Sequence, residues 1–283
     1  MSPVYITPGG HSICRTSGAV TVKDPHRAVR TSLRYRGAMH PGSTYLGIDL
    51  ASDPKRTGIA WLRDEGEKVM VEDVRVGADD DTIVSAVVTS QKTGVDVPFG
   101  WPRSFVELLE AHRTATLTPP PSTGPDWKRH VLYRATDLEV RRRVGKNPLS
   151  VASDKIAYPA IRWAGIAARL REQGAPVTPD GRGIACEVYP GAALVAWQLA
   201  GYTYKGAKGA TSRAALAEQL TARLPWLDWA GHRDACVDDD NALDAVIAAV
   251  VARDVDRGLA TPAPPELAEL AAEEGWIWLP EGS

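Results

Sequence analysis

The sequence lacks the cysteines that a disulfide-stapled fold would need. Its 283 residues include three cysteines, Cys14, Cys186 and Cys236, which are odd in number and widely separated. That arrangement disfavours a disulfide scaffold and fits a reducing compartment. His232 stands four residues before Cys236, but no second pair of ligands completes a zinc site.

Long apolar runs are also missing. No stretch of about 20 apolar residues occurs, so the sequence predicts no membrane-spanning helix and no membrane partner. The N-terminal residues contain no apolar run followed by the small residues of a cleavage site, so no secretion signal is expected. Together these absences predict a cytoplasmic protein.

Neither sign of charge is in excess. The 33 lysines and arginines nearly balance the 35 aspartates and glutamates, which gives a formal net charge of −2. A global attraction to nucleic acid is therefore not expected, and any basic patch has to be local. The chain also lacks a nucleophilic serine elbow, a Walker loop and a dinucleotide fingerprint.

The residues that are present divide the chain into two parts. Residues 1–43 are rich in Gly, Ser, Thr, Arg and His without an apolar period, which predicts a disordered, weakly basic N-terminal extension. Met39, within it, is a candidate translation start. Residues 44–283 show no repeat and no linker, and with 44% apolar residues in the whole chain we expect them to form a single domain.

The pattern after position 43 predicts strands and helices in a definite order. Strands are expected at 44–51, 57–62, 68–76, 94–97 and 183–188, with a last edge strand at 276–279. Helices are expected at 79–90, 127–144, 155–171, 190–200, 212–224, 241–257 and 264–274. This order predicts an α/β fold with a mixed five-stranded sheet, helices on both faces and a helical insertion over about 101–180.

Three acidic residues stand at the ends of apolar strands. Asp49, Asp96 and Glu187 are each at the carboxyl end of the first, fourth or fifth expected strand. Those strands can lie side by side and parallel, and ligands bind at the carboxyl edge of such sheets. A carboxylate at the rim of a buried strand is costly unless a charged partner meets it.

The helix expected at 241–257 adds oxygen ligands to this edge. Asp240 and Asp244 are four residues apart and Asn241 and Asp244 are three apart, so each pair shares a helix face. Asp244 is the hardest of these to explain structurally, because a lone acid rarely faces a core. Asp240 also suits a helix cap, since acids favour a helix N-terminus.

The other acids have structural alternatives. Asp49 could be a turn residue, and Asp96 could be a hydrogen-bond acceptor at a strand end. Glu187 could pair with an arginine such as Arg162. The convergence of all of them at one sheet edge is a stronger indication than any single member.

Carboxylates that gather in one place repel one another unless a cation lies between them. Hard oxygen ligands suit Mg²⁺ or Mn²⁺, and we expect Asp49, Asp96, Asp240 and Asp244 to bind it, with Glu187 as a further catalytic acid. Two such ions about 4 Å apart can activate a water and stabilise the leaving oxygen of a phosphodiester. The pattern therefore predicts a metal-dependent hydrolase that acts on nucleic acid.

Five short segments follow one another in a fixed order along the chain. They are Gly47-Ile48-Asp49-Leu50-Ala51, Val95-Asp96-Val97-Pro98-Phe99-Gly100, Glu187-Val188-Tyr189-Pro190, Asn241-Ala242-Leu243-Asp244-Ala245 and Glu274-Gly275-Trp276-Ile277. Together they resemble segments of the DUF429 family, and the resemblance runs from about residue 44 to 280. The family is regarded as predicted nucleases, so the resemblance implies a ribonuclease H-like fold and nuclease activity.

The late helix also resembles that of Holliday-junction resolvases, in which two metal-facing residues are three apart. Here the first of them is Asn241, a weaker ligand than Asp or His. The side chain of Asp240 points about 100° away around the helix. This departure leaves a one-metal site or an inactive variant open.

Basic residues provide candidate contacts to substrate. Further segments that resemble family elements are Tyr133-Arg134-Ala135-Thr136-Asp137 and Pro148-Leu149-Ser150. Arg134 and Arg141, seven residues apart on one expected helix face, could receive phosphates. Lys205 follows Tyr202 and Tyr204 and could contact a phosphate or a base. The structural alternatives are a solvated basic face and ordinary surface residues.

Two other functions agree with parts of the pattern. A catalytically inactive ribonuclease H-like module that binds nucleic acid or protein would keep the acids for structure, and the near-neutral charge and Asn241 fit it. An ATP-dependent enzyme of the actin and sugar-kinase type shares the strand topology, but the turn at 52–57 has no glycine and no second phosphate loop occurs. The sequence leaves open DNA, RNA or a small phosphoester as substrate, endo- or exonuclease cleavage, and the oligomeric state.

Overall fold

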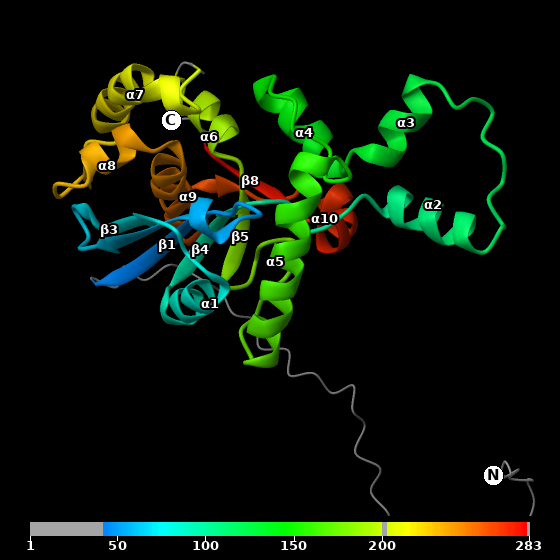
Figure 1. Cartoon of the computed structure of the whole chain (residues 1–283), viewed down its shortest axis with the longest axis horizontal. Coiled ribbons are helices and arrows are strands. Elements are labelled where there is room, and N and C mark those ends of the chain that lie inside the picture. Colours follow the sequence, from blue (N-terminus) through cyan, green and yellow to red (C-terminus); the bar gives the residue numbers. More distant parts are fainter. Residues whose placement is uncertain (1–41, 200–202, 282–283) are drawn as a thin grey trace, which may run out of the picture. The chain divides into compact units, whose positions relative to one another are not determined.

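A mixed sheet of eight strands is the centre of the computed structural model, which describes residues 42–199 and 203–281. The strand order is β6-β3-β2-β1-β4-β5-β8-β7 (Figure 1). The α/β fold with a mixed sheet is thereby confirmed. The expected N-terminal extension, with Met39, lies almost wholly outside the described residues.

The first five strands form the arrangement that the sequence predicts. β1 (Ser43–Asp49), β2 (Gly58–Asp64) and β3 (Val69–Val76) make an antiparallel meander. β4 (Lys92–Asp96) pairs with β1 in parallel, and β5 (Ala185–Val188) pairs with β4 in parallel. The carboxyl ends of β1, β4 and β5 therefore lie at one edge of the sheet.

Three further strands extend the sheet beyond the predicted five. They are β6 (Leu227–Asp228), β7 (Ala260–Thr261) and β8 (Ile277–Pro280). β6 and β7 have two residues each, too few to produce an alternating apolar pattern. The prediction of the last strand as an edge strand is wrong, because β7 pairs with β8 on its outer side.

Helices surround the sheet and include the expected insertion. They are α1 (Asp80–Thr89), α2 (Arg103–Arg113), α3 (Pro125–Leu132), α4 (Ala135–Val144), α5 (Asp154–Glu172), α6 (Pro190–Ala196), α7 (Ala210–Arg223), α8 (Arg233–Asp238), α9 (Asp240–Asp256) and α10 (Ala268–Glu274). Helices α2 to α5 all lie between β4 and β5 in the chain. Among the described residues, no helix has the length and apolar character needed to cross a bilayer.

The prediction of a single helix at 127–144 is wrong, because the helical backbone is interrupted between α3 and α4. Tyr133 has extended backbone angles, and Arg134 is the N-cap of α4. The Asp137 carboxylate accepts from the Arg134 backbone N–H at 2.9 Å and thereby starts a new helix. The regular spacing of apolar residues continues across this capping box, so the sequence pattern alone did not indicate that the helix is interrupted.

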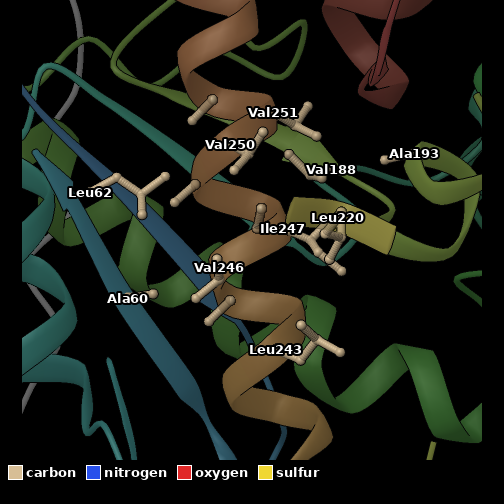
Figure 2. Packing of buried hydrophobic residues seen from close by; sticks show 14 of the residues in the cluster. Ala60, Leu62, Val188, Ala193, Leu220, Leu243, Val246, Ile247, Val250 and Val251 are labelled. Carbon is tan, nitrogen blue, oxygen red and sulfur yellow. The ribbon is translucent and has the colours of Figure 1, made fainter. Parts of the chain in front are cut away.

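The strands direct alternate side chains into two separate apolar cores. Tyr45 of β1 belongs to the core around α9, whereas Leu46 and Ile48 belong to the core around α1 and α5. Figure 2 shows α9 with Ala60 and Leu62 of β2 on one side. Helix α9 is thus buried against the sheet, and its described residues from Ala242 to Asp254 are all buried.

Three strand glycines allow α9 to approach the sheet at backbone distance. A Cβ on Gly58 of β2 would lie 2.1 Å from the carbonyl oxygen of Asn241. A Cβ on Gly47 of β1 would lie 1.9 Å from the carbonyl oxygen of Ala245, and one on Gly94 of β4 would lie 2.2 Å from that of Ala248. All three oxygens belong to the α9 backbone, which cannot move aside as a flexible side chain could. Any larger residue at these positions therefore has to push the helix away from the sheet.

We predict that Gly47→Ala lowers the free energy of unfolding by about 3 kcal/mol or more, because the added methyl overlaps α9 backbone. The matched control is Gly165→Ala in α5, where the glycine is exposed and an added Cβ meets nothing within 4 Å. That control is expected to gain up to about 1 kcal/mol, since alanine favours a helix over glycine. Urea denaturation of both variants measures the difference, and equal stabilities would contradict the close-contact argument.

Candidate metal centre

Asp49 and Asp96 lie beside each other at the carboxyl edge of the sheet. They are the last residues of β1 and β4 and are direct partners in the parallel ladder. Each follows its glycine, Gly47 or Gly94, by two residues, and side chains two apart in a strand share a face. Both carboxylates therefore point to the face that α9 covers.

Asp244 of α9 completes a group of three carboxylates. One oxygen from each of Asp49, Asp96 and Asp244 lies within 4.8 Å of the other two. Asp244 is fully buried, and the two strand acids are half-buried. Close contact between α9 and the glycines brings the first turns of the helix to the strand ends, so Asp244 meets two acids that are far from it in the sequence.

The loop segment before α7 supplies the partners of Asp244. The Tyr204 hydroxyl donates to Asp244 Oδ1 at 2.9 Å, and the Lys205 ammonium pairs with Asp244 Oδ2. The Lys205 side chain is 53% exposed and enters from solvent. Lys205, predicted from the sequence as a substrate contact, is therefore placed directly at the acids.

Arg213 of α7 fixes this loop, and sequence reasoning missed it. Its buried guanidinium donates to the carbonyl oxygens of Tyr204 and Gly206, both at 2.8 Å. It also donates to Val237 O at 2.6 Å and Asp238 O at 2.9 Å, at the end of α8 just before α9. The spacing of Arg213 in the sequence could have indicated its burial. It lies on the same helix face as the buried apolar residues three, four and seven positions later in α7.

Burial makes both strand acids hard to ionise. Burial raises the pKa of Asp49 to about 8, and repulsion from Asp96 adds to this rise. Burial also raises the pKa of Asp96 to about 6, against the opposing effect of the Lys205 ammonium. A cation placed among these oxygens would relieve both effects.

The donor set fits a hard divalent cation. Its three members are carboxylates, and anionic oxygen is the ligand that Mg²⁺ and Mn²⁺ prefer. Nearby aspartates 239 and 240 add negative potential at Asp49. The geometry therefore agrees with the predicted convergence of Asp49, Asp96 and Asp244 on one site.

Glu187 does not join the group, although it lies on the neighbouring strand. It pairs in register with Val95, one residue before Asp96, and so points to the opposite face of the sheet. There the Arg134 guanidinium donates to both of its carboxylate oxygens, at 2.7 and 2.8 Å. Glu187 Oε2 also accepts from the Phe99 backbone N–H at 2.9 Å, which holds the loop that follows Asp96.

Arg134 and Arg141 do not share a surface. Arg134 is 1% exposed and also pairs with Asp137 at 2.8 Å, so it fastens the insertion to the sheet and is shielded from a phosphate in solvent. Arg141 is exposed on α4 and lines a small pocket with Arg129. The alternative partner considered for Glu187, Arg162, instead pairs with Asp80 at 2.8 Å.

Asp240 stands beside the group but outside it. Its Oδ1 accepts from the Gly206 backbone N–H at 3.2 Å, next to the loop of Lys205. It is also not the helix cap. Asp239 caps α9, and its Oδ1 accepts from both the backbone N–H and the side-chain amide of Asn241 at 2.8 Å.

The chain is similar to a known family over most of its length. The family model described as "Protein of unknown function (DUF429)" matches residues 47–269. This range includes all three acids of the group. No curated protein and no solved structure matches the chain.

We predict that Asp49→Asn stabilises the metal-free protein at neutral and alkaline pH. Because the folded-state pKa of Asp49 is raised to about 8 from its ordinary value of 3.8, the folded protein binds more protons than the unfolded chain between these values. Wild-type stability therefore falls as pH rises from about 4 to 8, and the variant avoids this loss. In EDTA, the variant is expected to gain about 1–3 kcal/mol over wild type at pH 8 and little at pH 4. Urea denaturation across this range would contradict the site electrostatics if the gain did not grow with pH.

We predict unequal effects of the two partners in the buried ion pair. Arg134→Met leaves the carboxylates of Glu187 and Asp137 buried without a cation and is expected to cost about 3–5 kcal/mol. Glu187→Gln leaves the Arg134–Asp137 pair intact and is expected to cost about 1 kcal/mol. Urea denaturation measures both, and calorimetric titration with Mn²⁺ should show unchanged affinity in Glu187→Gln. Loss of Mn²⁺ binding in that variant would instead place Glu187 in the metal centre.

Proposed function

We propose that this chain, which belongs to the DUF429 family, is a divalent-metal-dependent nuclease that hydrolyses phosphodiester bonds. The observation that supports this most directly is the convergence of Asp49, Asp96 and Asp244. Burial raises the pKa of both strand acids, and repulsion from Asp96 raises that of Asp49 further, so this arrangement does not serve stability. Such an arrangement is typical of functional sites.

The strand arrangement supports a ribonuclease H-like fold for this enzyme. Strands β3, β2 and β1 form the antiparallel meander, and β4 and β5 continue the sheet in parallel. The acids stand at the carboxyl ends of β1 and β4, where ligands bind in open α/β sheets. A late helix, α9, supplies the third acid across the sheet face.

The three carboxylates would hold Mg²⁺ or Mn²⁺, with Asp244 anchored by the Tyr204 hydroxyl. A bound divalent cation supplies Lewis acidity, which favours deprotonation of a water and stabilises negative charge on a leaving oxygen. The chain orients the ligands through the β1–β4 register, the cap of α9 and the Arg213 contacts to the loop. Glu187 is not among the proposed ligands and holds the Phe99 backbone in the loop after Asp96.

Nucleic acid is the proposed substrate class, because local basic groups stand at the same sheet edge. Lys205 reaches the acids from solvent. Lys55 and Arg56 are exposed in the short 3₁₀ turn Pro54–Arg56 that joins β1 to β2 just beyond Asp49. These positive groups compensate locally for a chain with no net basic charge and suit contacts to phosphates.

We predict that Asp49→Asn and Asp96→Asn each reduce Mn²⁺-dependent cleavage by at least about 100-fold, since each removes an anionic ligand from the centre. The matched control is Asp254→Asn, another buried acid on α9. Asp254 lies ten residues beyond Asp244 in the same helix, about 15 Å along its axis. Its substitution should leave cleavage unchanged.

The assay presents single-stranded, duplex, hybrid and branched nucleic acids with Mg²⁺ or Mn²⁺ in turn. Cleavage that is equal in wild type and both ligand variants would sink the proposed chemistry. Binding of nucleic acid without any cleavage would favour the inactive ribonuclease H-like module instead. A melting-temperature shift on adding metal, lost in Asp49→Asn, tests metal binding separately from activity.

A further inference from the structure

Lys205 provides the positive charge that the three acids face in this structure. Its ammonium pairs with Asp244 Oδ2. Within residues 42–199 and 203–281, no other ion pair reaches Asp49, Asp96 or Asp244. The Lys205 ammonium thus covers Oδ2 of Asp244, an oxygen that would otherwise be available to a metal.

The two oxygens of Asp244 have different partners. The Tyr204 hydroxyl donates to Oδ1 at 2.9 Å, and Tyr204 is itself buried. Lys205 holds Oδ2, and its side chain is 53% exposed whereas that of Asp244 is 0% exposed. Oδ2 is therefore the oxygen that a cation entering from solvent would meet, and it is the one that Lys205 covers.

The backbone on both sides of Lys205 is held by hydrogen bonds, whereas its side chain is held only at the ammonium, by Asp244 and the face of the Tyr204 ring. Arg213 donates to the carbonyl oxygens of Tyr204 and Gly206, one residue on each side of Lys205. The backbone of Lys205 is therefore held in place. Its flexible four-carbon stem lets the ammonium leave Asp244 without any movement of the loop.

We infer that Lys205 is a built-in counter-ion that competes with the divalent metal for Asp244 and is displaced when the metal binds. This inference rests on the proposed metal centre. Without metal, the ammonium offsets part of the repulsion among the acids. After displacement, the anchored loop keeps the ammonium within one side-chain length of the centre, where it can meet a substrate phosphate.

Competition has a direct thermodynamic consequence. Two cations that exclude each other from one carboxylate lower each other's apparent affinity by the same factor. Removal of the ammonium should therefore strengthen metal binding. A lysine that only contacted substrate would leave metal affinity unchanged, and one that positioned the ligands would weaken metal binding when lost.

The experiment is calorimetric titration of the metal-stripped full chain with Mn²⁺ in the absence of nucleic acid. Lys205→Ala and Lys205→Gln are expected to bind Mn²⁺ about tenfold more tightly than wild type, a typical size for such coupling. Lys208→Ala is the matched control, because Lys208 is exposed three residues further along and pairs with none of the acids in the described structure. Its Mn²⁺ affinity should equal that of wild type.

Thermal melting provides a second readout that needs no activity. In EDTA at pH 8, both Lys205 variants should melt below wild type, because the acids lose their neutralising charge. Saturating Mn²⁺ should raise their melting temperatures by more than it raises that of wild type. The less disruptive Lys205→Gln keeps most of the side-chain length, so its result decides the case if the alanine variant does not fold.

The outcomes separate this inference from the proposed function. Wild-type binding that is lost in Asp244→Asn but unchanged or weakened in Lys205→Gln would overturn the competition and leave the metal centre intact. Absence of Mn²⁺ binding at millimolar concentration in wild type and in both Lys205 variants would overturn the metal centre as well.

Discussion

The close contact of α9 with the strand glycines, Gly47 and Gly94 above all, is the constraint on which the candidate site depends. Gly47 and Gly94 leave no side chain between the strand backbones and the helix. The helix can therefore lie low enough on the sheet for Asp244 to reach Asp49 and Asp96. Because each strand acid follows its glycine by two residues, the same alternation that opens the space for the helix also directs both acids toward it.

This close packing places negative charge where water is scarce. The pKa of Asp49 and of Asp96 is raised, first by burial. The protein offsets the charge locally, with a hydroxyl and an ammonium on Asp244 and with a buried arginine that holds their loop. The buried acids lower the free energy of unfolding at neutral pH, as functional sites commonly do. This loss of stability is the physical argument for the proposed cation at the centre.

The sequence was sufficient for the parts of the site that depend on local pattern. Apolar strands ending in Asp49 and Asp96, and an acid within the apolar face of the helix at Asp244, predicted the convergence. The side of the sheet to which Glu187 points could not be predicted. It depends on the register of β5 against β4, and a shift of one residue moves every side chain to the opposite face. The pairing of Glu187 with Arg134 rather than Arg162 depends in turn on how the insertion folds back. Strands β6 and β7 could not be predicted either, because two residues are too few to show an alternating pattern of apolar side chains.

The position of Glu187 bears on the number of ions in the proposed metal centre. A two-ion site needs more anionic ligands than the three that converge here, and Glu187 is on the other face with its charge neutralised by Arg134. Asp240 already accepts a backbone hydrogen bond from the Lys205 loop, and Asp239 is engaged in capping α9 through Asn241. Asn241 therefore contributes to the helix start, and its amide nitrogen is committed to that role. For the proposed metal centre, the side chains that remain favour one divalent cation, with the Lys205 ammonium as the second positive charge beside it.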